Sequence, residues 1–479
     1  MALRTAEQYF KDLRRDKKKV FILGKEVPGY VDHPLIKPSI SCIGQTFKLA
    51  EEPKYEGLLT AKSGFVNEDV SRFNHIHQDI GDLVKKVKML RILGQETASC
   101  FQRCVGFDAM NAVFSVTYDL EKKYGKDYHA RFREFLKHMQ RGDLLCGGVM
   151  TDVKGVRSLR PSQQPDPDMY VRIVEEKAGG IVVRGAKANI TGAVAADELL
   201  VMPTTVMRED DRAYAVCFAI PADSKGLIYV LGRQPTDSRR MEGSEFDFGN
   251  PYGATEAMII FDDVFVPEER IFMRGEHEFA SSIVERFSSY HRQCYGGCKS
   301  GLCDVLIGAV NRIAKILGIE KSSNFIDKIT QMVHLNETMW SCSLACSHEG
   351  FRLEAGSYLV NLALAQVCKL NVTEMTYEIA RLAEDLAGGA LVTSPSEMDL
   401  KNPVVGKFIK KYYKGVPEIP AEERLRLQRL IEFLCYSHCL RTEAMHGAGS
   451  PAAQRIMLRR YVNLEEKSDM AMKLAGLKE

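Results

Sequence analysis

The chain alternates between helix-forming and strand-forming sequence in three long blocks, and this order restricts its possible folds more than any other feature. Residues 1–145 are mostly helix-forming. Within Ile80–Leu90, apolar residues recur with the helical period, and Lys85, Lys86 and Lys88 are predicted to occupy the opposite, solvated side. Further helices are predicted at Phe107–Tyr118 and Tyr128–Gln140.

The middle block, Gly147–Ile271, is strand-forming. The run VRIVEEKAGGIVVRGAKA has two β-rich halves joined by a Gly-Gly turn, which predicts a hairpin. Other predicted strands are Tyr214–Ala222, Gly226–Gly232 and Glu256–Pro267. After Phe272 the strand pattern stops, and long helices with apolar stripes are predicted at Leu302–Leu317, Asn324–Ser347, Ser357–Leu386 and Glu422–Met445.

These blocks predict an α+β multidomain fold. A chain of 479 residues is too long for one small core. We therefore expect an N-terminal helical domain at residues 1–146, a middle β domain at 147–275 and a C-terminal helical bundle at 276–479.

Composition excludes several classes of function. The net charge of +2 gives no broad basic surface, so we expect no nucleic-acid partner. No run of 18 apolar residues is present and the N-terminus lacks an apolar signal segment, so neither a membrane span nor secretion is expected. Thirteen cysteines, an odd number with scattered spacing, indicate free thiols in a reducing cytoplasm rather than a disulfide framework.

Two short segments carry candidate metal ligands. Cys100 and Cys104 form a CxxxC pair, and His291 precedes Cys298 by seven residues. Three thiolates and one imidazole could hold a [4Fe-4S] cluster with one unusual corner, at which iron could act as a Lewis acid. Cys294 competes with Cys298, and spacing alone does not choose between them.

The surroundings of the cysteines separate candidates from core residues. The CxxxC pairs Cys342/Cys346 and Cys435/Cys439 lie in apolar helical sequence and are predicted to be buried core thiols. Cys100 and Cys104 instead have Thr, Ser, Gln and Arg neighbours, which are polar groups that can tune a cluster. In YHRQCYGGCKSG, Gly296 and Gly297 are predicted to let the backbone approach an inorganic group.

Longer motifs reveal a family resemblance that runs almost end to end. The chain resembles the 4-hydroxybutyryl-CoA dehydratase family, whose members also isomerise vinylacetyl-CoA. The motifs are VDHP at Val31–Pro34, TASCFQRCVG at Thr97–Gly106, GGVMTDVKG at Gly147–Gly155, RGAKANITG at Arg184–Gly192, YHRQCYGGCK at Tyr290–Lys299, RLAEDLAGG at Arg381–Gly389 and RTEAMHGAGSP at Arg441–Pro451.

The resemblance implies cofactors and an assembly. It implies FAD and a [4Fe-4S] cluster in a homotetramer built as a dimer of dimers, acting on an acyl-CoA substrate. It places the cluster ligands at Cys100, Cys104, His291 and Cys298, which leaves Cys294 as a bystander. It also implies a fold similar to acyl-CoA dehydrogenases, with the same helical, β, helical order.

The flavin must be held without a dinucleotide fingerprint, because no GxGxxG follows a predicted strand. The resemblance places FAD between the β domain and the bundle. The residues predicted to hold its isoalloxazine and ribityl groups are Met150, Thr151, Lys154, Ser162, Lys187 and Thr191. The pyrophosphate or adenine of FAD is predicted to contact Gly388, Gly389 and the segment His446–Ser450, within which His446 and Gly449 are the candidates. These residues could contact the FAD of their own subunit or of a neighbouring one.

The resemblance also selects catalytic candidates and a reaction. The candidates are His291, Glu443, Glu256, Tyr295 and Lys299. The implied reaction converts 4-hydroxybutyryl-CoA to crotonyl-CoA and water by a radical route, in which FAD is a temporary one-electron acceptor and iron assists the leaving hydroxyl.

Three other functions compete with this one. A flavin-dependent aromatic hydroxylase of the 4-hydroxyphenylacetate type, or an acyl-CoA dehydrogenase, could share the fold, but neither needs the cysteine and histidine set. An iron-sulfur sensor would leave Glu443 and Lys299 without a role.

Overall fold

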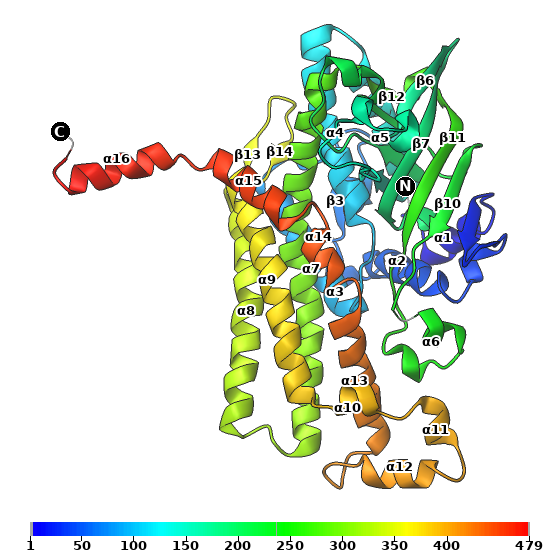
Figure 1. Ribbon diagram of the computed structural model, residues 1–479, viewed down its shortest axis with the longest axis vertical. Coiled ribbons are helices and arrows are strands. Elements are labelled where there is room, and N and C mark those ends of the chain that lie inside the picture. Colours follow the sequence, from blue (N-terminus) through cyan, green and yellow to red (C-terminus); the bar gives the residue numbers. More distant parts are fainter. Residues whose placement is uncertain (1–2, 236, 478–479) are drawn as a thin grey trace.

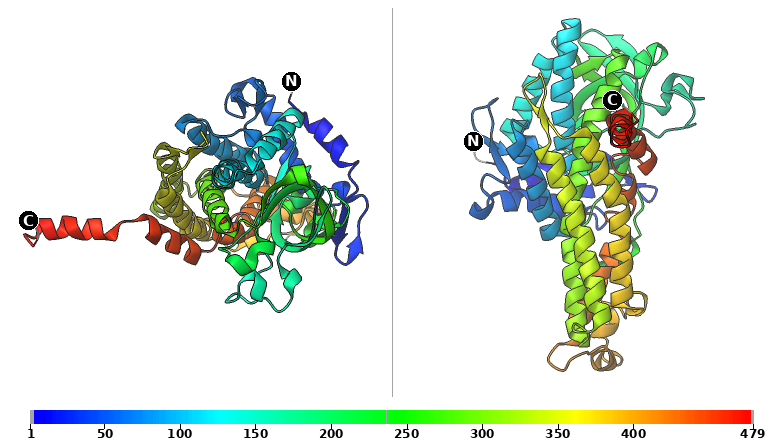
Figure 2. Two further views of the ribbon diagram at one scale, coloured as in Figure 1. Left: turned by 90° about the horizontal axis from the view of Figure 1, so that it is seen from above. Right: turned by 90° about the vertical axis from the view of Figure 1, so that its left-hand side faces the viewer.

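The computed structural model describes residues 3–235 and 237–477 and has an α+β multidomain fold. Two β-sheets lie beside a bundle of long, nearly parallel helices (Figure 1). Viewed from above, the sheets and the bundle stand side by side, and the C-terminal helix projects away from both (Figure 2).

The three helices predicted in the N-terminal part are present, as α3 (Ile80–Thr97), α4 (Cys104–Tyr124) and α5 (Tyr128–Gly142). Two further helices, α1 (Ala6–Leu13) and α2 (Lys37–Ala50), precede them. Asp79 caps the first turn of α3, since its side chain accepts a hydrogen bond from the Asp82 N–H. The segment between α3 and α4 is tightly bent, with positive φ at Ala98 and Gln102, and it carries Cys100.

The larger sheet has six strands. Its order is β2 (Lys25–Glu26), β1 (Lys19–Ile22), β10 (Leu227–Leu231), β11 (Glu256–Pro267), β7 (Gly180–Thr191) and β6 (Arg172–Lys177). The hairpin predicted from the Gly-Gly turn is confirmed, because β6 and β7 pair antiparallel from Lys177–Gly180 outward. Strands β1 and β2 come from the N-terminal part, and one apolar core joins α1 and α2 to this sheet.

The smaller sheet has four strands, in the order β12 (Ile271–Arg274), β9 (Val216–Pro221), β8 (Glu198–Val201) and β5 (Cys146–Val149). Two strand pairs lie outside both sheets: β3 (Thr60–Lys62) with β4 (Asp69–Ser71), and β13 (Phe351–Arg352) with β14 (Tyr358–Leu359).

Four helices build the bundle. They are α7 (Ala280–Leu317), α8 (Ser323–His348), α9 (Leu362–Ala387) and α13 (Ala421–Tyr436). The predicted start of the first, Leu302, is wrong, because α7 begins at Ala280 and contains the whole YHRQCYGGCKSG motif. Tertiary packing outweighs the low helix propensity of its glycines.

The two glycines of that motif have a different role from the predicted one. A Cβ on Gly296 would lie 2.6 Å from the Cys368 Sγ of α9, and a Cβ on Gly297 would lie 2.7 Å from the Val87 carbonyl oxygen of α3. They therefore let α9 and α3 approach α7 closely, rather than bringing backbone to an inorganic group.

The last predicted helix is also not continuous. After α13 the chain bends at residues 437–441, and a short helix, α14 (Thr442–His446), follows. The remaining helices are α6 (Asp237–Met241), α10 (Ala390–Thr393), α11 (Glu397–Lys401), α12 (Gly406–Tyr412), α15 (Pro451–Tyr461) and α16 (Leu464–Leu474). Among the described residues, no helix is long and apolar enough to cross a membrane.

Candidate functional site

A small enclosed cavity lies where α7 meets the α3–α4 segment and α14. It brings together residues that are up to 344 positions apart in sequence. Its lining is Ser99, Cys100, Phe101, Cys104, His291, Cys294, Tyr295, Cys298, Lys299, Leu302 and Glu443. All four predicted cluster ligands and three further predicted catalytic residues therefore line one cavity.

Three elements position the predicted ligands. Cys100 lies in the bent segment before α4, and Cys104 is the first residue of α4. His291 and Cys298 are seven residues apart on α7, which is about two helical turns, so both face the cavity. All four side chains are buried, with residue exposures between 5% and 8%.

The donor set suits a cluster better than a single metal ion. Burial raises the pKa of the Cys298 thiol to about 11 and that of Cys104 well above its usual range. A buried thiol of this kind is deprotonated by a bound metal. A single metal ion needs ligand atoms that lie close to one another. Within the described residues, the only group of three whose ligand atoms lie within 4.8 Å of one another is Asp108, His291 and Cys294. The predicted ligands are spread more widely around the cavity.

Cys294 and Cys298 differ in what they contact. The Cys294 thiol donates to Asp108 Oδ2 at 3.0 Å, on the side of α7 that faces α4. The Cys298 thiol has only a long contact, 4.0 Å, to the Tyr295 carbonyl oxygen of its own helix. The geometry therefore favours Cys298 as the thiol that is free to bind a metal.

Sequence reasoning missed a buried ion pair next to His291. The Asp108 carboxylate accepts from Lys86 Nζ at 2.5 Å, and its other oxygen contacts His291 Nδ1 at 2.8 Å. Although burial works against ionisation, Lys86 and the His291 hydrogen bond lower the pKa of Asp108. The prediction that Lys86 lies on a solvated face is wrong, because this residue is fully buried.

Glu443 and Lys299 form a second ion pair, and both residues line the cavity. Lys299 Nζ donates to Glu443 Oε2 at 2.6 Å, and the Cys100 thiol donates to Oε1 at 3.2 Å. Despite burial, which opposes it, Lys299 lowers the pKa of Glu443. Tyr295 lies beside this pair, with Lys299 Nζ 5.1 Å from its ring centroid and the His291 ring 5.2 Å away.

Glu256 does not line the cavity, but it lies near Glu443. It is the first residue of β11, and the Thr191 hydroxyl donates to its carboxylate at 2.7 Å. Burial raises the pKa of Glu256 to about 7, and the charge of Glu443 adds to this rise while His438 opposes it. A carboxyl with this pKa can exchange a proton near neutral pH.

Two further bases near the cavity, half-buried His438 and buried Lys369, were not predicted. His438 lies in the bend before α14; burial works against its protonation, but Cys439 and Glu443 raise its pKa to about 9. Lys369 of α9 donates to the Ala444 carbonyl oxygen and lies 4.3 Å from the Tyr295 ring centroid. Burial, with the charge of Lys299, lowers the pKa of Lys369 to about 7.

The residues predicted to hold the isoalloxazine lie outside the cavity. Lys187 Nζ contacts Asp152 Oδ1 at 2.6 Å and donates to the Met150 carbonyl oxygen at 2.8 Å, so its ammonium is already paired. Thr151 accepts from the Ala188 N–H through its carbonyl oxygen. Lys154 has a positive φ of 78° in an exposed loop, and the Ser162 hydroxyl donates to Asp211.

The predicted pyrophosphate segments lie apart from each other. Gly388 directly follows the last residue of α9 and lies 19 residues beyond Lys369, which is about 28 Å along a helix, and Gly389 comes next. His446 ends α14 and is exposed, and Gly449 has a φ of 98°. Gly447 lies against the Tyr295 hydroxyl, where a Cβ would be only 1.6 Å from the oxygen. The segment from His446 therefore shapes the Tyr295 wall of the cavity.

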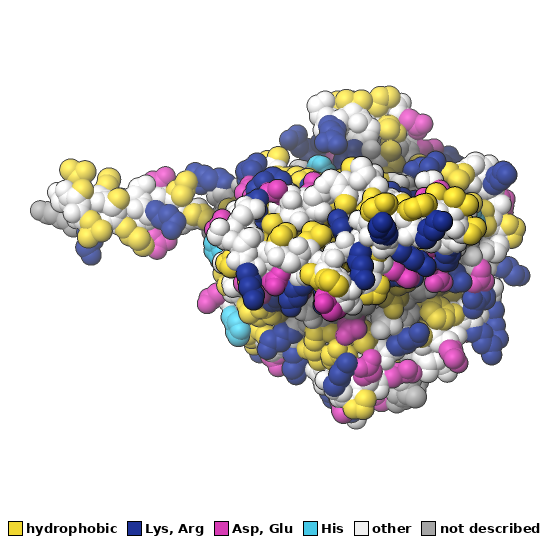
Figure 3. Space-filling view, turned by 90° about the horizontal axis from the view of Figure 1, so that it is seen from below, with side chains coloured by type: hydrophobic (Ala, Val, Ile, Leu, Met, Phe, Trp, Pro, Cys, Tyr) yellow, Lys and Arg dark blue, Asp and Glu magenta, His cyan; other side chains and the backbone are white. Residues whose placement is uncertain are grey.

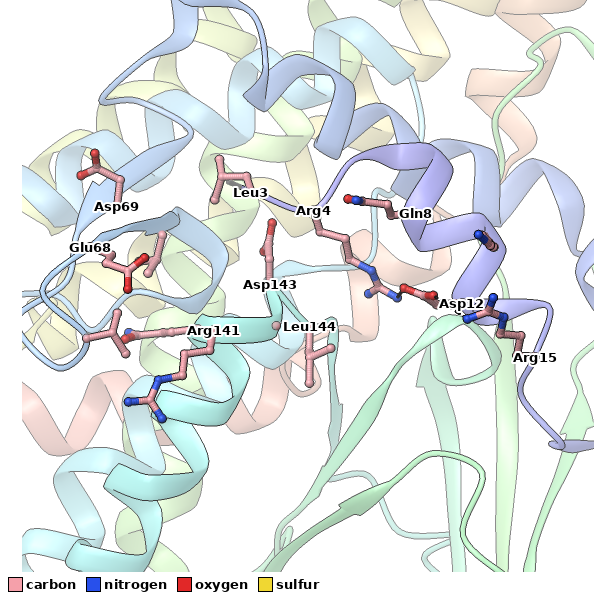
Figure 4. A pocket seen from close by; sticks show the side chains of 15 residues that line it. Leu3, Arg4, Gln8, Asp12, Arg15, Glu68, Asp69, Arg141, Asp143 and Leu144 are labelled. Carbon is pink, nitrogen blue, oxygen red and sulfur yellow. Dashed lines mark hydrogen bonds and ion pairs between the residues drawn. The ribbon is translucent and has the colours of Figure 1, made fainter. Parts of the chain in front are cut away.

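A second hollow lies at the surface between the N-terminal segment, β4 and the end of α5 (Figure 4). It contains none of the predicted site residues. Arg4 within it pairs with Asp12 and Asp197, and charges of both signs line it. Arg4 is therefore already paired within the chain, and the enclosed cavity, which holds the predicted site residues, is the candidate site.

Comparison with known proteins agrees with the geometry. The models for the 4-hydroxyphenylacetate 3-hydroxylase N-terminal and C-terminal regions match residues 5–273 and 280–476. A 4-hydroxybutyryl-CoA dehydratase/vinylacetyl-CoA-Δ-isomerase of Clostridium aminobutyricum is 50% identical over 99% of this chain and all of its own length.

Solved structures give the same relationship. The oxygen-tolerant archaeal 4-hydroxybutyryl-CoA dehydratase of N. maritimus has a TM-score of 0.98 at 47% identity, covering 100% of this chain and 96% of its own. The FAD complex of HpaB, an oxygenase component of 4-hydroxyphenylacetate 3-monooxygenase, has a TM-score of 0.83 at 21% identity, covering 98% of each chain. This second match supports the fold alone.

Proposed function

Because this chain belongs to the 4-hydroxybutyryl-CoA dehydratase family, we propose that it converts 4-hydroxybutyryl-CoA to crotonyl-CoA and water, and isomerises vinylacetyl-CoA to crotonyl-CoA. The observation that carries the proposal is the single cavity in which Cys100, Cys104, His291 and Cys298 meet the Glu443–Lys299 pair. An aromatic hydroxylase needs no such set of thiols, although the chain shares that fold.

The cavity residues support a [4Fe-4S] cluster held by Cys100, Cys104, His291 and Cys298. FAD is proposed because HpaB, which shares the fold, binds it. When bound, the cluster would supply a Lewis acid for the C4 hydroxyl and the flavin a reversible one-electron exchange.

Net dehydration removes one hydrogen from C2 and one from C3, releases the C4 hydroxyl as water and adds a proton at C4. Glu443 is proposed to transfer one of these protons, because the charge of Lys299 keeps its carboxylate ionised next to the cavity. Lys299 and Tyr295 are proposed to donate hydrogen bonds to the substrate. Glu256, whose pKa is about 7, is a second proposed proton carrier.

The flavin contacts are proposed on the resemblance. The geometry supports some of the predicted residues more than others. Met150 and Thr151, which follow β5, contact the Lys187–Ala188 part of β7, and Thr191 at the end of β7 contacts Glu256. The distance of Gly388 and Gly389 from the cavity suits contact with the flavin of a neighbouring chain rather than their own.

A homotetramer is proposed on the resemblance, and exposed apolar side chains support self-association. Apolar atoms run along the projecting helix α16 (Figure 3), and Leu474 there is 89% exposed. Val392 and Tyr412 are 73% and 68% exposed on α10 and α12. Such patches mark protein–protein contacts.

We also propose domain boundaries after residues 146 and 275, an arrangement of domains like that of acyl-CoA dehydrogenases, and a cytoplasmic location. The helical, β, helical order supports the arrangement, while the core shared by α1, α2 and the larger sheet links the first two domains. All thirteen cysteines, each within the described ranges, are free, as a reducing compartment requires.

The function is tested by assaying the purified chain without oxygen. Both 4-hydroxybutyryl-CoA and vinylacetyl-CoA should give crotonyl-CoA without an external electron acceptor, because the reaction has no net oxidation. Oxygen-dependent hydroxylation of a phenol, with no crotonyl-CoA formed, would contradict the proposal.

A further inference from the structure

Asp108 holds a position between two helices from which it can orient a histidine. It lies on α4, one turn after Cys104, and its side chain is fully buried. Oδ2 is 2.8 Å from Nδ1 of His291. A carboxylate at Nδ1 accepts the proton of that nitrogen, so the imidazole keeps Nε2 as its free electron pair.

Asp108 is poorly placed to be a ligand itself. Lys86 Nζ donates to Oδ1 at 2.5 Å, and the Cys294 thiol donates to Oδ2 at 3.0 Å, in addition to the His291 contact. A carboxylate with both oxygens engaged by three donors has little capacity left for a metal ion. Asp108 also does not line the cavity, whereas His291 does.

Lys86 is the cation that allows this carboxylate to be buried. It lies on α3, is fully buried, and also donates to the Tyr290 carbonyl oxygen of α7 at 3.1 Å. Its Nζ lies over the rings of Phe107 and Tyr290, at 5.5 and 5.2 Å from their centroids. The pair therefore ties α3 and α4 to α7 one residue before His291.

We propose that Asp108, held in place by Lys86, is a positioning residue that fixes the orientation and tautomer of His291 so that Nε2 faces the cavity. Metal-binding histidines commonly donate their second nitrogen to a carboxylate, which fixes the ring and raises its basicity. This inference rests on the proposed function, because it requires iron at the His291 corner.

The test is the rate at which a chelator removes iron from the anaerobic holoenzyme. Asp108→Asn keeps the size of the side chain and removes its charge. Loss of such an outer carboxylate lowers metal affinity by about 10–100-fold, so we expect iron release to be faster by about that factor. Flavin content should not change. In samples labelled with ¹⁵N-histidine, the nitrogen coupling to the reduced cluster should weaken in the same variant.

Asp304→Asn is the matched control. Asp304 also lies on α7 and pairs with Arg91 of α3, at 2.8 Å, but outside the cavity. It should release iron at the wild-type rate. A double variant, Lys86→Met with Asp108→Asn, removes both buried charges, so it avoids an unpaired lysine and should still release iron quickly.

The outcomes distinguish failure of the positioning role of Asp108 from failure of the proposed function. Wild-type release and nitrogen coupling in the double variant would overturn the positioning role and leave the proposed function standing. A wild-type chain that holds no iron would overturn both. Fast release that also occurs in Asp304→Asn would show general loosening of the helices and would likewise overturn the specific role of Asp108.

Discussion

Cys298→Ala should lose most of its iron and all measurable dehydration, and Cys100→Ala and Cys104→Ala should behave alike. Each substitution removes one of the three cavity thiols assigned to the cluster, and a [4Fe-4S] cluster normally needs four protein ligands. Iron and acid-labile sulfide per chain, together with crotonyl-CoA formation, measure the result.

Cys294→Ala is the matched control on the same helix. Its thiol contacts Asp108, so alanine at this position should retain iron. Loss of the cluster in Cys294→Ala together with its retention in Cys298→Ala would reverse the assignment. Cys342→Ala and Cys435→Ala should also keep iron, because neither thiol lines the cavity.

Glu443→Gln should slow both dehydration and vinylacetyl-CoA isomerisation by about 10²–10⁴-fold, the usual contribution of general acid–base catalysis. Glutamine keeps the shape of the side chain but cannot accept a proton. It also removes the ion pair with Lys299, 2.6 Å away. Steady-state rates with both substrates measure the effect.

Lys299→Gln separates proton transfer from charge. If the ammonium assists the leaving hydroxyl, this variant should harm dehydration more than isomerisation, which releases no hydroxyl. Near-normal isomerisation in Glu443→Gln would remove that residue from the proton path, whatever happens to dehydration.

The periodic parts of the fold could be predicted from sequence, while the interruptions could not. The strand Glu256–Pro267 follows from its strand-forming sequence, and the β6–β7 hairpin follows from two β-rich runs joined by a Gly-Gly turn. The sequence predicts that Gly296 and Gly297 admit an inorganic group, but close packing of α9 and α3 against α7 makes glycine necessary inside a helix. Such a requirement depends on neighbours that are distant in sequence.

The ligands of the site could be predicted, but not their supporting charges. A lysine in an amphipathic helix is normally solvated, and Lys86 was assigned to the polar side for that reason. Its spacing offered a clue, since it lies three residues after Leu83 and four before Leu90, which are both buried. Only the three-dimensional structure shows that Lys86 pairs with Asp108, which lies 22 residues further along the chain.

The bend after α13 could not be predicted from sequence either, although the resemblance does select Glu443. A continuous helix over Glu422–Met445 would have directed His438 and Glu443 differently, whereas the bend after α13 brings Glu443 to Lys299 and Cys100. Apolar periodicity continues across this bend, so sequence gave no reason to end the helix there.

The most direct test of the account is the metal and flavin content of the chain purified without oxygen. We predict about four iron and four sulfide per chain, one FAD, and a visible spectrum in which a broad iron-sulfur band underlies the flavin peaks. Flavin without iron would contradict the account, because the thiols and imidazole around the cavity would then have no cluster to hold.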